Sequence, residues 1–161
     1  MQRTDIEKAQ EQEAISRQYQ EEANKNVNRQ KRDGVVVTPT EVVDFQIRSV
    51  IAKIKEVHGR EPDQDLEWLD PFGGSGIYTA RLLQIVDLTP ERKYALSQNC
   101  IVIEIDPIAA QICANNLAKV LLEETGINDF VRVICTDTFA LSPDADLWAE
   151  SLSSVKPSIK L

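Results

Sequence analysis

The chain has 161 residues, of which 42% are hydrophobic and 27% charged, enough for one globular domain with a buried core. No apolar run approaches the ~18 residues that a membrane-spanning helix needs, and the polar start does not resemble a secretory signal, so we expect a cytoplasmic protein without a membrane partner. The formal net charge of −8 predicts weak nucleic-acid binding by this chain alone, since phosphate contacts need clustered lysine and arginine.

Residues 1–33 are predicted to form a polar N-terminal helix, with its regular part over 3–32 and its end at Asp33-Gly34. Glycine and proline are absent from 3–32, and a thin apolar stripe follows the helical period: Ile6, Tyr19, Ala23 and Val27. Three fates remain open for this helix: docking on the domain, docking on a further domain, or fraying.

Residues 34–140 alternate between helix and strand patterns. Thr40 is expected to cap a first helix. Apolar strands are then predicted at 66–69, 100–104 and 131–135, with helices to about 86 and 122 and a short helical or loop insert from 89. This alternation predicts an α/β fold with three parallel strands joined by right-handed crossovers. Residues 141–161 lose the pattern and are expected to be an irregular C-terminal tail.

The run Asp70-Pro71-Phe72-Gly73-Gly74-Ser75-Gly76 lies between the first strand and the following helix. Glycines let a backbone approach a ligand closely, and a helix N-terminus offers unpaired N–H groups. An acidic residue before the turn would repel phosphate oxygens, and it suits a ligand that joins an ammonium group to a nucleoside. S-adenosyl-L-methionine is such a ligand.

Each predicted strand ends in an acidic residue: Asp70, Glu104 and Asp137. Ligands of parallel sheets bind at the carboxyl ends of the strands, so we expect these carboxylates to gather at one site. Asp70 can orient the loop or meet an ammonium group, Glu104 can accept from both ribose hydroxyls, and Asp137 can accept from the adenine amino group.

The remaining site residues follow from the same placement. We expect Gly73, Gly74 and Gly76 to leave room for the methionine part of the ligand. Ile105 or Pro107 can pack on the adenine ring. Phe139 either covers a ring face or belongs to the core. Three cysteines, Cys100, Cys113 and Cys135, are too widely spaced for a zinc site, so we expect them reduced and buried and expect no metal.

The order of four segments resembles the amino-group (adenine-specific) DNA methyltransferases of restriction–modification systems: Val37-Thr38-Pro39 with Val42-Val43, Leu69 to Gly76, Glu104-Ile105-Asp106-Pro107, and Asp137-Thr138-Phe139. The chain is most similar to the methylase region of single-chain helicase–methylase enzymes, over about residues 34–139. The resemblance implies a Rossmann-like S-adenosylmethionine-dependent methyltransferase fold. It also implies that Thr38 and Pro39 contact the methionine moiety and that Phe72 belongs to the cofactor loop.

That family acts through Asn/Asp-Pro-Pro followed by Tyr or Phe, and none of the seven prolines here is adjacent to another. We therefore expect the cofactor-binding portion of a DNA adenine methyltransferase, with no catalytic residue of its own and no activity alone. In such a fold a fourth strand would flank the first, so the first strand is predicted to have an open edge. DNA would bind only with a catalytic and target-recognition region, and the open edge or the N-terminal helix would bind a protein partner or a second copy.

Other interpretations stay open at this point. The chain could be a non-catalytic interaction module, or a degenerate relic that keeps the fold. An RNA methyltransferase fragment shares the glycine loop. A dinucleotide-dependent oxidoreductase is a weaker alternative, because Gly74-Ser75-Gly76-Ile77-Tyr78-Thr79 fits Gly-x-Gly-x-x-Gly except at its last position.

Overall fold

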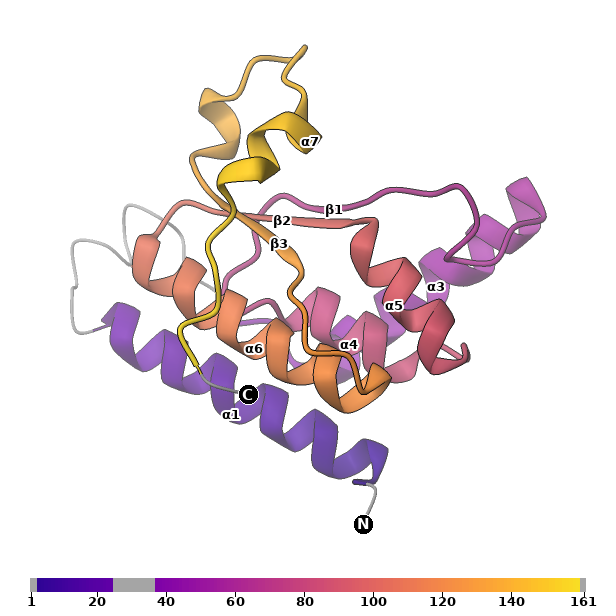
Figure 1. Ribbon diagram of the computed structural model, residues 1–161. Coiled ribbons are helices and arrows are strands. Elements are labelled where there is room, and N and C mark those ends of the chain that lie inside the picture. Colours follow the sequence, from indigo (N-terminus) through magenta and orange to yellow (C-terminus); the bar gives the residue numbers. More distant parts are fainter. Residues whose placement is uncertain (1–2, 25–36, 160–161) are drawn as a thin grey trace.

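The sheet at the centre of the fold has three parallel strands in the order β1-β2-β3 (Figure 1). The computed structural model describes residues 3–24 and 37–159. The strands are β1 (Trp68–Asp70), β2 (Cys100–Glu104) and β3 (Arg132–Cys135). The predicted α/β class and parallel sheet are therefore confirmed, and the arrangement is compatible with a Rossmann-like fold.

The middle strand is buried along its whole length because its side chains point alternately into two packed layers. Val102 faces the layer of helices and has no exposed surface. Ile101 and Ile103 face the opposite layer and are 4% and 1% exposed. Glu104, the last residue of β2, is only 7% exposed, so the strand delivers a nearly buried carboxylate to the edge of the sheet.

Helices α4 (Ile77–Ile85), α5 (Pro90–Gln98) and α6 (Pro107–Thr125) connect the strands and pack on one face of the sheet (Figure 1). The start of α6 shows why the chain turns into a helix after β2: Asp106 Oδ1 accepts the N–H of Ala109 at 2.8 Å, and Pro107 occupies the first helical position. The helical core is apolar, and its largest fully buried members include Val43, Leu83, Leu96, Leu117 and Val133.

Helix α3 (Thr40–His58) packs beside α4 and buries Val43 and Ile47. Thr40 is not the N-cap that the sequence predicted. The N-cap is Pro39, and the hydroxyl of Thr40 instead donates to Glu13 of the N-terminal helix. A hydroxyl at the first helical position is free to bond across to another element, whereas a capping hydroxyl is used within its own helix.

The C-terminal segment covers the other face of the sheet. It forms the short helices η1 (Thr138–Ala140), α7 (Leu147–Glu150) and η2 (Ser151–Ser153), so the predicted irregular tail contains helical turns. Leu141, Leu147 and Trp148 pack against the isoleucines of this face. Beyond η2, the N–H of Val155 donates to the carbonyl of Val133 at 2.8 Å, which covers the outer edge of β3.

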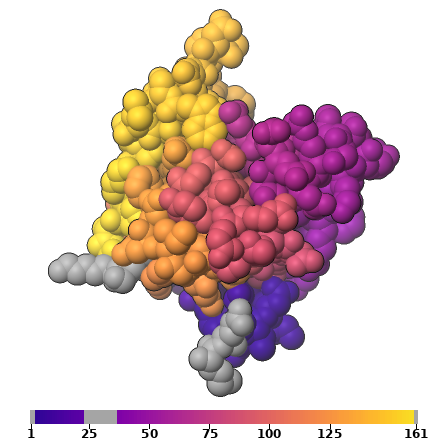
Figure 2. All heavy atoms as spheres, turned by 45° about the vertical axis from the view of Figure 1, so that its right-hand side comes forward, coloured from indigo at the N-terminus to yellow at the C-terminus, as the bar shows by residue number. Residues whose placement is uncertain are grey.

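The edge of β1 is open, as predicted. Among the described residues, β1 pairs only with β2. Leu69, at the centre of β1, remains 50% exposed. In the space-filling view the C-terminal segment and α3 lie on opposite sides of the molecule, with the N-terminal helix beneath (Figure 2).

The N-terminal helix α1 (Asp5–Asn24) docks on its own domain, under α4 and α6 and on the side away from the sheet (Figure 1). The apolar stripe is only partly turned to the domain, because Ile6 is 70% exposed whereas Tyr19 is half-buried. Among residues 5–22 of α1, the buried ones are polar: Lys8, Gln12 and Ser16. Val27 and the predicted helix end at Asp33-Gly34 lie outside the described residues.

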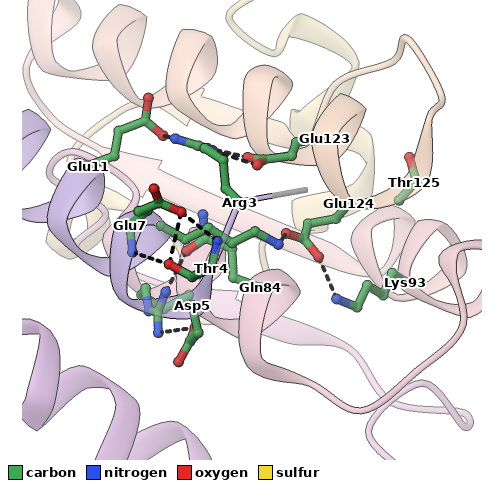
Figure 3. A network of polar contacts seen from close by, with 12 residues as sticks. Arg3, Thr4, Asp5, Glu7, Glu11, Gln84, Lys93, Glu123, Glu124 and Thr125 are labelled. Carbon is green, nitrogen blue, oxygen red and sulfur yellow. Dashed lines mark hydrogen bonds and ion pairs between the residues drawn. The ribbon is translucent and has the colours of Figure 1, made fainter. Parts of the chain in front are cut away.

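Ion pairs hold the first half of α1 in place (Figure 3). Arg3 pairs with Glu11 at 2.7 Å and also with Glu123 near the end of α6. Glu124 lies between Lys8 of α1 and Lys93 of α5, the latter at 2.6 Å. The docking surface is therefore charged as well as polar, which a search for apolar periodicity does not detect.

The cysteines are placed partly as expected. Cys100 and Cys113 are buried, and burial raises the pKa of the Cys100 thiol to about 12. Cys135 is exposed, which contradicts the expectation of three buried thiols, because it is the last residue of β3, where the chain leaves the sheet. Within residues 3–24 and 37–159 no group of His, Cys, Asp and Glu could hold a metal ion. No helix of these residues is long and apolar enough to span a membrane.

Candidate ligand-binding site

The carboxyl ends of the three strands interlock through hydrogen bonds. Glu104 Oε2 accepts the N–H of Gly74 at 2.8 Å, which ties the end of β2 to the loop after β1. The hydroxyl of Thr138 donates to the carbonyl of Pro71 at 2.6 Å, which ties the segment after β3 to the same loop. The segments that carry Asp70, Glu104 and Asp137 therefore lie together, as predicted.

Two of the loop glycines are required by packing within the protein. A Cβ at Gly73 would lie 2.2 Å from Val102 Cγ1, because the loop runs directly over β2. A Cβ at Gly76 would lie 2.8 Å from Cys113 Sγ, and Gly76 has a φ of +80°. Protein atoms thus fill the space beside these glycines, where the sequence analysis expected room for a ligand.

Gly74 is different, because among the described residues a Cβ there would meet a single side chain, the ring of Tyr19 in α1, with Cε1 at 3.5 Å. Its φ is +53°, and its N–H points to Glu104. Gly74 therefore presents bare backbone between a carboxylate and an aromatic ring. Of the predicted glycines, this is the one whose missing side chain leaves space beside the loop.

Asp70 carries an unsatisfied acceptor. Its Oδ1 accepts the N–H of Phe72 at 3.1 Å, whereas its Oδ2 is buried with no hydrogen-bond partner among the described residues. Burial raises the pKa of Asp70; the bond from Phe72 opposes this, and the charge of Glu104 adds to it. A buried carboxylate oxygen without a partner is costly, so a donor or a cation placed beside it would be bound favourably.

Two exposed aromatic rings stand beside the loop. Phe72 and Phe139 are 62% and 85% exposed, with ring centroids 5.6 Å apart and planes inclined by 40°. The core alternative for Phe139 is therefore wrong. Asp137 holds this pair in position, because its Oδ1 accepts the N–H of Phe139 at 2.9 Å. Ile105, directly after Glu104, is 51% exposed and is also available to a ligand.

The Thr-Pro element precedes α3. Thr38 is half-buried and Pro39 is exposed, and the Pro39 carbonyl accepts the N–H groups of Val42 and Val43 at 3.1 Å each. Helix α1 links this element to the glycine loop, since Glu13 binds the hydroxyl of Thr40 while Ser16 Oγ lies 2.8 Å from Ser75 Oγ. The sequence gives no indication that α1 takes part in the site, because the contacts of α1 are polar and follow no apolar pattern.

An open cavity of about 360 Å³ adjoins Asp70. It runs along the unpaired edge of β1, between α3 and α4, and its wall includes Val50, Trp68, Leu69 and Tyr78. Asp70 lines this cavity, whereas Gly74, Glu104 and Asp137 do not. The hollow therefore lies beside the site, where β1 lacks a second neighbour.

Comparison with known proteins gives similarities in structure only: no family model matches the chain, and no curated protein matches it. The DrdV–DNA complex, solved by cryo-electron microscopy, aligns over 80% of this chain with 21% identity and a TM-score of 0.72, which shows the shared fold. A nuclease-deletion mutant of the Type ISP restriction–modification enzyme LlaGI, in complex with a DNA substrate mimic, aligns over 73% with 25% identity and a TM-score of 0.62.

The ATP-dependent Type ISP restriction–modification enzyme LlaBIII bound to DNA aligns over 73% of this chain, with 26% identity and a TM-score of 0.61. The aligned parts are small portions of these large proteins: 13% of the DrdV chain, 11% of the LlaGI chain and 9% of the LlaBIII chain. The chain thus shares its fold with short segments of restriction–modification enzymes and is related to enzymes of that kind.

Proposed function

We propose that this chain is the S-adenosyl-L-methionine-binding portion of a DNA adenine methyltransferase of the restriction–modification type. The observation that carries the proposal is the unpartnered, buried Oδ2 of Asp70 beside a glycine loop whose Gly74 N–H is bonded to Glu104. The buried Oδ2 of Asp70 can accept from an ammonium group. The carboxylate of Glu104, at the end of the neighbouring strand, can bind a ribose. Together they suit a ligand that combines an ammonium group with a ribose. The similarity to LlaGI and LlaBIII, both solved with DNA or a DNA mimic, supports the restriction–modification setting.

Each proposed role fits the observed contacts. Asp70 Oδ2 would accept from the ammonium group of the ligand. The two oxygens of Glu104 accept backbone N–H groups from Gly74 and Asp106, which holds the carboxylate in place, and this carboxylate would bind the ribose. Asp137 would accept from the adenine amino group. Ile105 and Phe139 offer exposed apolar surface for the adenine ring, and Phe72 lies beside Phe139. Thr38 and Pro39 would contact the methionine moiety.

We assign no catalytic residue to this chain, because the sequence contains no Asn/Asp-Pro-Pro motif. When bound, the cofactor would supply the methyl group. The residues described here bind and orient it, and the groups that hold the target adenine would come from elsewhere. The open edge of β1 and the cavity beside Asp70 offer a place where a further strand of such a region, or a second copy, would add to the sheet.

Calorimetric titration with S-adenosyl-L-methionine tests the proposal. The variants are Asp70→Asn and Glu104→Gln, which keep side-chain shape and remove the charge. Asp87→Asn is the matched control, because Asp87 is an exposed carboxylate at the far end of α4. We expect binding by the wild type, a loss of at least about tenfold in affinity for both site variants, and no change for the control.

The outcome against the proposal is a wild-type chain that is folded by circular dichroism and binds no S-adenosyl-L-methionine. The chain would then be an interaction module or a relic. Titration with NAD⁺ and NADP⁺ under the same conditions tests the oxidoreductase alternative, and binding of either in place of S-adenosyl-L-methionine would overturn the methyltransferase assignment.

A further inference from the structure

We infer that helix α1 forms one wall of the ligand site and that Tyr19 is a ligand-contacting residue. The inference rests on the proposed function and extends it, since α1 lies outside the resemblance that suggested the site. It concerns the side of the glycine loop that faces the N-terminal helix.

The first step is the position of the Tyr19 ring. Its Cε1 lies 3.5 Å from the point where a Cβ of Gly74 would stand, which is ordinary van der Waals distance. Gly74 also donates its N–H to Glu104 Oε2 at 2.8 Å. The same loop residue is therefore flanked by the carboxylate proposed to bind ribose and by an aromatic ring, so a ligand seated against Glu104 and the bare Gly74 backbone lies within reach of that ring.

The second step is that the C-terminal half of α1 is fixed against the loop. Ser16 Oγ lies 2.8 Å from Ser75 Oγ, and Asn116 Nδ2 donates to the Ser75 carbonyl at 2.9 Å. Asn116 and Gln12 exchange two side-chain hydrogen bonds of 2.8 and 2.9 Å. All of these groups are buried, and buried hydrogen bonds are directional, so they set the register of α1 and with it the place of the ring three residues after Ser16.

The third step is the identity of the residue. Tyr19 is the one aromatic residue in the sequence 3–24. Tyr19 is half-buried, and its ring lies on the side of α1 that faces the glycine loop. An aromatic ring beside a nucleoside-binding loop supplies a broad contact surface for sugar, base or cation at small entropic cost.

The test compares the affinity for S-adenosyl-L-methionine of the wild type with that of Tyr19→Ala, Tyr19→Leu and Tyr19→Phe, by calorimetry. The matched control is Gln18→Ala, an exposed neighbour on the same helix. Loss of the ring in Tyr19→Ala and Tyr19→Leu should weaken binding about tenfold, whereas Tyr19→Phe should stay within about threefold of the wild type. Thermal midpoints of the ligand-free variants are measured beside the affinities, so that a change in stability is distinguished from the loss of a ligand contact.

Three outcomes are distinguishable. Wild-type affinity in Tyr19→Leu, while the wild type binds, overturns the inference and leaves the proposed function standing. A fall in affinity for Tyr19→Leu that is matched by an equal fall for Gln18→Ala also overturns it, because the effect would then belong to the helix and not to the ring. Absence of binding by the folded wild type overturns the proposed function, and the inference with it.

Discussion

Arg81 and Asp44 form a two-point ion pair in the interior of the protein. Arg81 Nε lies 2.8 Å from Asp44 Oδ1, and Nη2 lies 2.7 Å from Oδ2, with no part of the Arg81 side chain exposed. Nη2 also lies 2.9 Å from Asp5 Oδ1 of α1, and Nη1 donates to Gln84 Oε1 at 2.8 Å. One guanidinium therefore joins α1, α3 and α4.

Replacement of Arg81 by alanine should destabilise the fold severely. It would leave Asp44, whose side chain is 13% exposed, without its cation, and breaking a buried pair by removing one partner costs about 3–5 kcal/mol. The free energy of unfolding in urea measures the loss. The matched control is Lys55→Ala, because Lys55 pairs with Glu61 at 2.9 Å and both side chains are exposed, by 69% and 40%, so loss of this pair should matter little. An equal fall in the free energy of unfolding for the two variants would show that burial of Arg81 does not make its ion pair more important than an exposed one.

The substitutions Gly76→Ala and Gly126→Ala distinguish two reasons why a position requires glycine: a positive φ and the lack of space for a Cβ. Both have positive φ, +80° and +73°, so alanine at either pays the left-handed penalty of roughly 1–2 kcal/mol. A Cβ at Gly126 meets nothing within 4 Å, whereas at Gly76 it would lie 2.8 Å from Cys113 Sγ and 3.2 Å from Leu117 Cγ. Gly76→Ala should therefore cost about 1–3 kcal/mol more than Gly126→Ala in urea unfolding. A smaller loss for Gly76→Ala would show that the loop is not packed on α6 as described.

The strands and the strand-end site could be predicted from the sequence, since β2 is a continuous apolar run that ends in Glu104 and parallel strands deliver their carboxyl ends to one edge. The docking of α1 could not be predicted. Its buried residues, Lys8, Gln12 and Ser16, carry no apolar signal, and their partners Glu124, Asn116 and Ser75 are about 60 to 116 positions away. The exposure of Phe139 could not be predicted either, because an aromatic residue after a strand is compatible with a core position and with a surface position.

Asp70→Asn should make the ligand-free protein more stable at neutral pH. Burial and the charge of Glu104 raise the pKa of Asp70 in the folded state above its ordinary value. Because the folded protein then holds the proton more tightly than the unfolded chain, stability falls as the pH rises from the ordinary carboxyl pKa through the raised folded value, and the lost stability is not regained above it. Asparagine lacks this ionisation, so the variant should exceed the wild type at neutral pH and approach it in acid.

Urea unfolding at a series of pH values measures this difference. Asp87→Asn, which removes an exposed carboxylate elsewhere on the protein, is the control variant. A gap between the wild type and Asp70→Asn that does not grow with pH would show that Asp70 does not ionise at a cost. Together with the loss of binding expected for the same variant, a gain in stability would indicate that the fold gives up stability at Asp70 for its ligand.

Docking of α1 should weaken with salt. Its contacts include the pairs of Arg3 with Glu123 and of Lys8 with Glu124, and few apolar side chains support them. The screening length falls from roughly 10 Å at 0.1 M to 3 Å at 1 M ionic strength, which weakens partly exposed pairs. Hydrogen exchange over residues 5–24 should therefore accelerate between about 0.1 and 1 M sodium chloride, while exchange over the central turns of α6 stays constant.

A variant that removes one charge distinguishes the contribution of the ion pairs from a general effect of salt on hydrogen exchange. Glu124→Gln should raise exchange over 5–24 even at low salt, because Lys8 and Lys93 would then share a neutral partner while remaining largely buried. Glu21→Gln, an exposed carboxylate on the same helix, should leave exchange unchanged. If α1 and α6 instead exchange together in every condition, α1 opens only with the whole domain, and the polar face on which it docks is as strong as the apolar core.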